Sequence, residues 1–298
     1  ILITGGTGLI GYALIKYFQE NSNANIFQII RKNDIKDDLN IFKGTEIIHT
    51  DLSNPSFIKV LPKNIDIIIH LAQSENYKLF PEYADQVFDI NIRSSFNLIE
   101  FARINNCKKF FYASSGSVYD NTITNNLPLR ENSLLKLNVN DFYTASKIAT
   151  ENIISPYSKY MDILIGRIFF PYGIRQKKSM FIPKIINMVN DSKEININGK
   201  DGLIFNPTSV ELIAYCIFEL LNKDKKGIFN IASPNKISLI NFVETIAEVL
   251  NKKANINYQN EVNNQNYSVD LKYLYSNINY IKEKGLKYFI KEYKNVFF

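Results

Sequence analysis

A tyrosine and a lysine four residues apart, Tyr143 and Lys147, follow a serine-rich turn, and together these residue types can move a proton. Residues four apart share one face of a helix, so the two side chains are predicted to point the same way. A nearby ammonium favours the tyrosinate, and the spacing therefore predicts a lowered pKa for Tyr143. Such a tyrosine can take the proton of a substrate hydroxyl while hydride leaves the same carbon, and a serine at the end of the preceding strand can hydrogen-bond that oxygen. An exposed pair on a helix is the alternative interpretation of this spacing taken alone.

A glycine-rich loop at the start of the chain, Thr4–Gly11, predicts the partner for this chemistry. Gly5 permits a tight turn after an apolar run, Gly8 lets the backbone approach a pyrophosphate, and Gly11 lets a helix pack closely on a sheet. Backbone N–H groups and the helix dipole then favour the anion, so a nicotinamide dinucleotide is expected there. A glycine-rich turn without a ligand is the alternative. The predicted contacts in the loop are Gly5, Thr7, Gly8, Leu9, Ile10 and Gly11.

The choice between NAD and NADP depends on the residues that follow the second apolar run, Ile26–Ile30. NAD sites usually place an acid there to hold the ribose 2′-hydroxyl. This chain has Arg31 and Lys32 instead, which could bind a 2′-phosphate, so the sequence favours NADP. Both residues could also be ordinary solvated charges. Asp51 and Leu52, after the third apolar run, are expected to border the adenine.

Short apolar runs alternate with longer amphipathic stretches through the first half of the chain, which is typical of βα units in a parallel sheet. The predicted strands are Ile1–Thr4, Ile26–Ile30, Glu46–His49, Ile65–Leu71, Lys109–Ala113 and Ile163–Arg167. The predicted helices are Leu9–Glu20, Pro55–Leu61, Pro81–Asn105 and Asp141–Tyr160. Asp141 is a suitable N-cap for the last of them. The strands are nearly continuously apolar, as expected for strands covered on both faces.

The alternation of short apolar runs and amphipathic stretches changes after Arg167. This change predicts a dinucleotide-binding domain over residues 1–167 and a substrate-binding region over residues 168–298. Part of the second region is expected to pack back on the first. The second region is expected to contain the strand Ile228–Ala232 and helices at Met180–Asn190, Val210–Leu221 and Ser238–Asn251. The polar segment Gln259–Asn266 is predicted to be a mobile surface loop. The fold class is therefore α/β, a Rossmann-type doubly wound parallel sheet with a smaller mixed α/β C-terminal substrate domain.

Composition excludes several other classes of protein. The 298 residues are 46% hydrophobic and 13% aromatic, enough to bury a sizeable core. No run approaches the ~20 apolar residues of a membrane span, and no signal peptide is visible, so no membrane partner is expected. Two cysteines interpreted as buried small hydrophobes fit a reducing cytoplasm, which is the expected location. The net charge of +6 is scattered rather than clustered, which argues against nucleic acid. The cysteines Cys107 and Cys216 lie far apart and the chain has two histidines, so no metal site is expected.

Taken in order, these motifs resemble the extended short-chain dehydrogenase/reductase family, the NAD-dependent epimerases, dehydratases and reductases of nucleotide sugars. The resemblance covers nearly the whole chain. It rests on residues 4–11, Asp51-Leu52, His70-Leu71-Ala72, Asn91, Ser114–Tyr119, Tyr143–Lys147 with Glu151, Arg167–Gly173, Asn206–Glu211 and Gly227–Ala232.

The resemblance implies an NAD(P)-dependent enzyme that transfers hydride at a sugar carbon of a nucleotide-activated sugar. Tyr143 would be the general base or acid, and Lys147 would hold the nicotinamide ribose and tune Tyr143. Ser115 matches the family's substrate-binding serine, and Ser117 is a second hydroxyl close by.

The resemblance also implies further cofactor contacts and an assembly. Leu71 and Ala72 would line the cofactor site, Asn91 would support it, and Pro171 would lie near the nicotinamide amide. Relatives commonly form homodimers through the two long helices, here the predicted helices that contain Asn91 and Tyr143.

Two departures from the family pattern narrow the reaction and leave the substrate open. The 4,6-dehydratases have an Asp-Glu pair where this chain has Gly116 and Ser117, so epimerisation or keto-sugar reduction is favoured over dehydration. Many relatives contact the nucleotide diphosphate through an asparagine and an arginine, where this chain has Phe170 and the stretch Leu203–Phe205. Phe170 is expected to line the substrate site, with a place in the core as the alternative. Substitute cations could come from Lys177, Lys178 and Lys200, each of which could equally be an ordinary surface lysine.

The absence of the usual asparagine and arginine contacts to the diphosphate motivates a second hypothesis. The chain would then be a non-catalytic dinucleotide-binding protein that senses redox state or acts as an assembly partner. A sensor needs no proton relay, so the complete set of serine, tyrosine and lysine argues against it.

Overall fold

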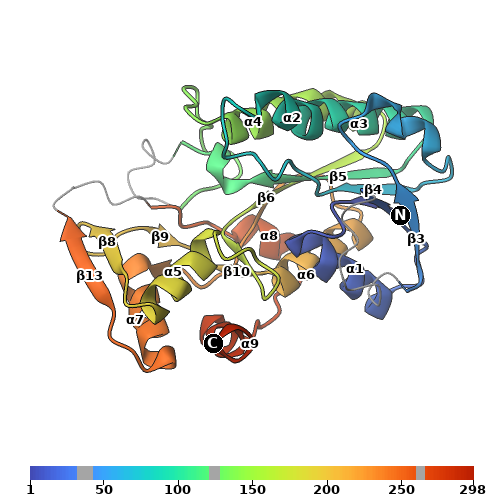
Figure 1. The fold of residues 1–298 in the computed structure, drawn as a ribbon. Helices are drawn as coiled ribbons and strands as arrows, with labels where there is room; N and C mark the ends of the chain where they lie inside the picture. The colour runs from blue at the N-terminus through green and yellow to red at the C-terminus, as the bar shows by residue number, and fades with distance from the viewer. Residues whose placement is uncertain (32–42, 121–127, 260–265) are drawn as a thin grey trace.

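The computed structural model describes residues 1–31, 43–120, 128–259 and 266–298. A seven-stranded parallel sheet runs through the molecule in the order β11-β6-β5-β4-β1-β2-β3 (Figure 1). Its strands are β1 (Leu2–Thr4), β2 (Ile26–Ile30), β3 (Thr45–His49), β4 (Ile67–His70), β5 (Lys109–Ser115), β6 (Asp162–Ile168) and β11 (Gly227–Ile231). The strand order reverses between β1 and β4, and the crevice beyond the carboxyl ends at such a point is where doubly wound sheets bind ligands. The predicted Rossmann-type fold is confirmed.

Two layers of helices cover the sheet, with α2, α3 and α4 on one face and α1 and α6 on the other (Figure 1). Their bounds are α1 (Leu9–Asn21), α2 (Ala84–Phe88), α3 (Ser94–Ile104), α4 (Phe142–Ile154) and α6 (Val210–Asn222). Successive strand residues point to opposite faces. Ile3 and Phe111 accordingly join the core beneath α1 and α6, while Leu2 and Phe110 join the core beneath α3. This two-sided burial is the reason that the strands are nearly continuously apolar.

The predicted helix Pro81–Asn105 is broken into three segments, because a π-helical turn, Asp89–Arg93, separates α2 from α3. Inside this turn the Asn91 carbonyl accepts hydrogen bonds from the hydroxyls of Ser95 and Thr150. These hydroxyls satisfy a carbonyl where the helix is widened, and such single π turns frequently lie at functional sites.

Two other predicted helices are shorter or tighter than expected. α4 ends at Ile154, and Pro156, which has no backbone N–H, lies at the start of the 3₁₀ turn Ser155–Lys159. The segment Pro55–Val60 is a 3₁₀ turn rather than an α-helix.

The C-terminal part adds a third core and also completes the central sheet. The helices α5 (Phe181–Asn190), α7 (Leu239–Leu250) and α9 (Leu286–Phe297) enclose this core beside a parallel pair, β8 (Glu194–Asn198) and β13 (Asn255–Gln259). The short helix α8 (Lys272–Asn277), α9 and the β8–β13 pair have no counterpart in the sequence prediction. β11 pairs with β6, and α6 packs on α1. The division at residue 167 stays a prediction.

Other short elements connect these layers, and they include β7 (Pro171–Tyr172) with β10 (Thr208–Ser209) and β9 (Ile204–Phe205) with β12 (Ile237–Ser238). The predicted loop Gln259–Asn266 lies almost entirely outside the described residues. Throughout the described ranges, no helix has the length and apolar character that crossing a bilayer requires.

Candidate active site

The glycine loop connects β1 to α1 at the point where the strand order reverses. Gly5 has a φ of +73°, and a Cβ there would stand 2.8 Å from the backbone N of Ala72. A Cβ at Gly11 would stand 2.2 Å from the carbonyl O of Gly5, so no larger residue fits either position. Gly8 is exposed at the N-cap of α1, where no side chain caps the helix. The loop therefore presents open backbone to an anion, which fits a dinucleotide pyrophosphate.

The ends of β1 and β4 are tied together beside this loop by a buried histidine. His70 contacts Thr4 Oγ1 through Nδ1 at 2.7 Å and Ser95 Oγ through Nε2 at 2.8 Å. Thr4 Oγ1 also accepts from the N–H of Ala72 at 3.2 Å, and Leu71 donates to the Thr4 carbonyl. Burial lowers the pKa of His70 to about 3, so it stays neutral and acts as a structural link. In the described parts of the chain, no three His, Cys, Asp or Glu side chains are grouped to hold a metal.

Ser115, Tyr143 and Lys147 are brought together by β5 and α4. Ser115 is the last residue of β5, and α4 begins after Asp141, whose carboxylate accepts from the N–H of Thr144 at 2.8 Å as the predicted N-cap. Lys147 Nζ donates to the Ala113 carbonyl at 2.7 Å and lies 5.7 Å from the centre of the Tyr143 ring.

Ser117 lies beside this group. Thr144 Oγ1, one residue after Tyr143, donates to Ser117 Oγ at 3.1 Å, and Ser117 N donates to Ser115 Oγ at 3.1 Å. These bonds hold the first turn of α4 against the turn that follows β5.

Burial is the largest cause of the shifted pKa values of Tyr143 and Lys147. It raises the pKa of Tyr143 to about 12, although a hydrogen bond with Ser115 acts in the opposite direction. It lowers the pKa of Lys147 to about 7, opposed by the charge of Glu151. The predicted lowering of the Tyr143 pKa is therefore wrong for this structure, because desolvation penalises both charged forms.

Asn91, in the π-helical turn, connects two segments beside the group of Ser115, Tyr143 and Lys147. Its side chain accepts from the N–H of Ser74 at 2.9 Å and donates to Ser146 Oγ at 3.0 Å. Ser146 in turn donates to the Tyr143 carbonyl at 2.7 Å. Asn91 thus joins the segment after β4 to the helix that carries Tyr143 and Lys147.

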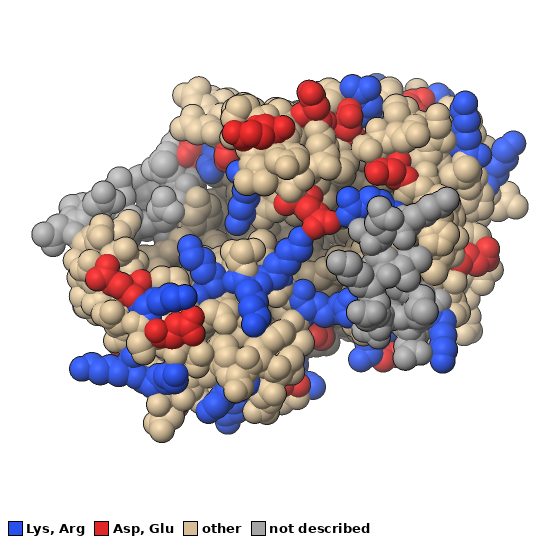
Figure 2. Space-filling view, viewed as in Figure 1, with Lys and Arg blue, Asp and Glu red and all other residues tan. Residues whose placement is uncertain are grey.

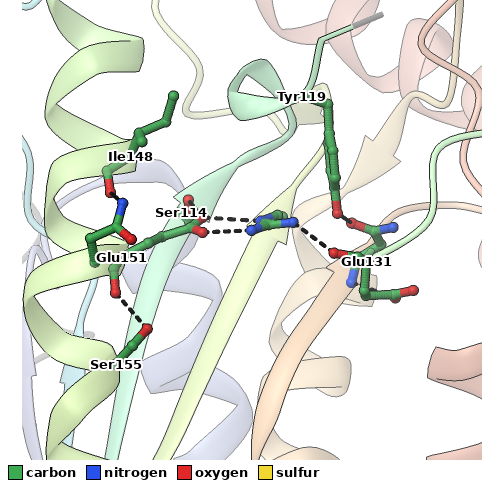
Figure 3. A network of polar contacts seen from close by, with 9 residues as sticks. Ser114, Tyr119, Glu131, Ile148, Glu151 and Ser155 are labelled. Atoms are coloured by element: carbon green, nitrogen blue, oxygen red, sulfur yellow. Dashed lines mark hydrogen bonds and ion pairs between the residues drawn. The ribbon is translucent and has the colours of Figure 1, made fainter. Parts of the chain in front are cut away.

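A buried ion pair fixes α4 on the sheet one turn after Lys147. Arg167 of β6 donates to both carboxylate oxygens of Glu151 at 3.1 and 2.6 Å, and Ser114 Oγ donates to the same carboxylate (Figure 3). The two charged side chains are only 3% and 5% exposed. Arg167 also donates to the Glu131 carbonyl at 3.0 Å, and its guanidinium lies 4.7 Å from the centre of the Tyr119 ring. Glu151 and Arg167 are among the residues that carry the family resemblance, but the sequence analysis predicted no role for either of them.

The predicted 2′-phosphate residue Arg31 follows β2 and forms an ion pair with Glu75, N to O 2.7 Å. Glu75 follows β4, and its other carboxylate oxygen contacts Lys177, which lies beyond β7. Hydrogen bonds from Lys177 and Arg31 hold the pKa of Glu75 below its usual range. Lys32 lies outside the described residues. Figure 2 shows Lys and Arg side chains gathered across the middle of the molecule, in the view of Figure 1, beside acidic side chains.

The two departures from the family pattern pack against each other. Phe170 has a φ of +37°, and its ring centre lies 4.9 Å from that of Phe205 and 6.0 Å from that of Tyr267. Leu203 is partly buried against the same core. Positions that the resemblance linked to a diphosphate therefore form one apolar cluster.

The remaining predicted residues lie near the strand ends. Pro171 begins β7, and its carbonyl accepts from Gln176 at 2.8 Å. Asp51 is exposed after β3, where it accepts hydrogen bonds from Ser53, and Leu52 packs on the core beneath α3.

The structure thus combines a doubly wound parallel sheet, this loop after β1 and a Ser, Tyr and Lys group at β5 and α4, the features on which the resemblance to the extended short-chain dehydrogenase/reductases rests. The model of the NAD dependent epimerase/dehydratase family matches residues 1–232, and the chain belongs to that family.

Several relatives share most of the chain. The dTDP-4-dehydro-6-deoxyglucose reductase of Escherichia coli is 29% identical over 282 residues, which cover 88% of this chain and 85% of the relative. A dTDP-D-glucose 4,6-dehydratase of Dictyostelium discoideum is 28% identical over 271 residues, and the match spans 84% of this chain but 62% of that protein. A UDP-glucuronic acid 4-epimerase of Bacillus cereus, solved with UDP-glucuronic acid and NAD, has the same fold, with a TM-score of 0.84, 21% identity and 99% of each chain covered.

Proposed function

We propose that this protein is an NAD(P)-dependent epimerase or ketoreductase that acts on a sugar carbon of a nucleotide sugar. The observation that carries the proposal is the grouping of Ser115, Tyr143 and Lys147 at the carboxyl end of β5. The glycine loop follows β1 at the same end of the sheet. Relatives that act on nucleotide sugars support the substrate class.

A bound dinucleotide supplies the acceptance and return of hydride. Ser115 hydrogen-bonds the reacting oxygen, and Tyr143 exchanges a proton with the same oxygen. Because the pKa of Tyr143 is raised to about 12, its phenol is protonated at neutral pH and is ready to donate to a carbonyl. Donation of this proton to a carbonyl accompanies hydride return in both candidate reactions, the second half of an epimerisation and the reduction of a keto-sugar. In the oxidative direction, Lys147 in its charged form stabilises the tyrosinate.

Dehydration is disfavoured by the shape of the turn after β5. A Cβ at Gly116 would stand 2.3 Å from the Phe169 ring, and Phe169 is itself buried. An acidic side chain at position 116 would therefore require the ring to move. Gly116 and Ser117, in place of the acidic pair of the 4,6-dehydratases, support epimerisation or reduction over dehydration.

A screen of nucleotide sugars tests the proposal. The protein is incubated with each dinucleotide and with UDP-glucose, UDP-glucuronic acid, dTDP-glucose and a dTDP-4-keto-sugar, and the products are analysed by NMR and mass spectrometry. Epimerisation leaves the mass unchanged, reduction adds two hydrogens, and dehydration removes one water. We expect one of the first two outcomes. A bound dinucleotide with no transient change of redox state, and no conversion of any sugar, would contradict the proposal and favour the sensor hypothesis.

We propose that Arg31 binds the 2′-phosphate of NADP and that NADPH binds more tightly than NADH. Glu75 competes with a phosphate for this guanidinium, because it already forms an ion pair with Arg31. Glu75→Gln should therefore raise the affinity for NADPH relative to NADH by roughly fivefold, the effect of about 1 kcal/mol between exposed charges. Fluorescence titration of both dinucleotides measures the ratio. Glu248→Gln, in the exposed pair with Lys287, is the matched control. An equal change for both dinucleotides would refute the proposed role of Arg31.

We propose that the protein forms a homodimer through the layer of α2, α3 and α4. The outer surface of this layer exposes large apolar side chains, among them Phe88, Phe96 and Ile104. Phe96→Asp should convert the dimer to a monomer, because a carboxylate cannot be buried unpaired in an apolar interface. Sedimentation velocity measures the change. Tyr258→Asp, which alters an exposed ring on β13, should leave the dimer intact. Identical sedimentation of Phe96→Asp and the unaltered protein would argue against this interface.

A further inference from the structure

The segment after β4 runs along the first turn of α4 and places a second tyrosine against Tyr143. The ring centres of Tyr77 and Tyr143 are 4.7 Å apart, with the ring planes at 45°. Three residues later, Phe80 stacks on Phe142 with the ring centres 5.3 Å apart. Two aromatic contacts therefore fix this segment beside the proposed proton donor.

The Tyr77 hydroxyl points to the C-terminal part of the chain, where its hydrogen-bond partner is the sulfur of Met180 at 3.6 Å. A thioether is a weak acceptor, so a sugar oxygen can replace it with a gain in hydrogen-bond strength. Burial raises the pKa of Tyr77, which keeps the phenol protonated and able to donate. An ionised Tyr77 would further raise the pKa of Tyr143, so the two phenols lie within electrostatic reach of each other.

The same two segments are joined a second time, two residues before Tyr77. Glu75 contacts Lys177, and the Lys177 carbonyl accepts from Met180 N in the turn that leads to Met180. The Glu75–Lys177 ion pair and the Tyr77–Met180 contact thus join the segment after β4 to the segment before α5, and together they hold Tyr77 in place. A side chain that is already ordered loses little entropy when it binds a ligand.

We propose that Tyr77 is a substrate-binding residue that donates its hydroxyl to an oxygen of the sugar ring, with its own ring packed on Tyr143. The nucleotide sugar exchanges the Met180 sulfur for its own hydroxyl or carbonyl oxygen. The inference rests on the proposed function, because it assumes that a nucleotide sugar is the ligand. It adds a sugar contact from the segment after β4, where sequence patterns assigned only cofactor contacts.

The experiment compares Tyr77→Phe with the unaltered protein, both loaded with dinucleotide. Calorimetry measures the binding of UDP-glucose, UDP-glucuronic acid and dTDP-glucose, and of UDP and dTDP without a sugar. Tyr77→Phe should weaken the best-bound sugar nucleotide by about 3- to 10-fold, as expected for one neutral hydrogen bond. Binding of the nucleotide without a sugar should not change, because the substitution keeps the ring and its contact with Tyr143.

Two further variants separate a sugar contact from a structural role. Tyr83→Phe removes an exposed phenol from the same segment and should bind every ligand normally. Met180→Leu removes the sulfur and keeps the side-chain size, so sugar binding should stay within about twofold of the unaltered protein. Normal sugar binding by Tyr77→Phe, an equal loss for UDP alone, or a loss in Met180→Leu as large as in Tyr77→Phe would each overturn the inference. If the unaltered protein binds none of the sugar nucleotides, the proposed substrate class fails, and the inference fails with it.

Discussion

Replacing Tyr143 with phenylalanine should lower turnover by about 100- to 10,000-fold, the usual contribution of a positioned acid or base. The phenol is the group beside Ser115 that can exchange a proton with a substrate oxygen, and phenylalanine has no proton to give. The ring contact with Tyr77 should survive, since only the hydroxyl is lost. Dinucleotide binding should therefore stay nearly normal. Product formation from the best sugar in the screen and fluorescence titration of the dinucleotide measure the two effects separately.

Tyr258→Phe is the control for this substitution, because it removes an exposed phenol from β13. Turnover by Tyr143→Phe equal to that of Tyr258→Phe would exclude Tyr143 as the proton donor. A parallel loss of dinucleotide binding would instead indicate a damaged cofactor site.

Replacing Arg167 with methionine should lower the free energy of unfolding by about 3–5 kcal/mol, because it leaves the Glu151 carboxylate buried without its cation. Ser114 would then be its remaining partner among the bonds described above. Urea denaturation measures the loss. The control is Lys287→Met, which breaks an exposed pair with Glu248 and should cost at most about 1 kcal/mol.

A double variant tests the cause of this loss. Glu151→Gln combined with Arg167→Met removes both charges, so most of the stability lost in Arg167→Met should return. A double variant no more stable than Arg167→Met would show that packing of the arginine, rather than an unpaired charge, is responsible. A loss in Arg167→Met no larger than in Lys287→Met would contradict the importance of the pair itself.

The sequence predicted those features of the site that depend on local geometry. The glycine loop needs only a strand before it and a helix after it, and Asp141 caps α4 as its position indicates. Tyr143 and Lys147 share a helix face because they are four residues apart, and the structure keeps them near Ser115.

Features that depend on distant contacts could not be predicted in the same way. The Arg31–Glu75 pair joins residues 44 positions apart, and the Tyr77–Met180 contact joins residues 103 positions apart. The pKa of Tyr143 depends on burial by the whole fold, which outweighs the neighbouring lysine that the spacing made visible. The strands β8 and β13 were missed because their exposed asparagines, with Glu194 and Gln259, resemble a loop.

The return of β11 to the edge of β6 has a consequence for how the protein is made. During synthesis, β6 leaves the ribosome well before Gly227–Ile231, so its outer edge stays unpaired for that interval. An open strand edge invites pairing with another chain, and incompletely folded sheets aggregate for this reason. A fragment that stops at residue 167 would keep that open edge permanently. The N-terminal half should therefore be poorly soluble when it is expressed alone, whatever dinucleotide is added.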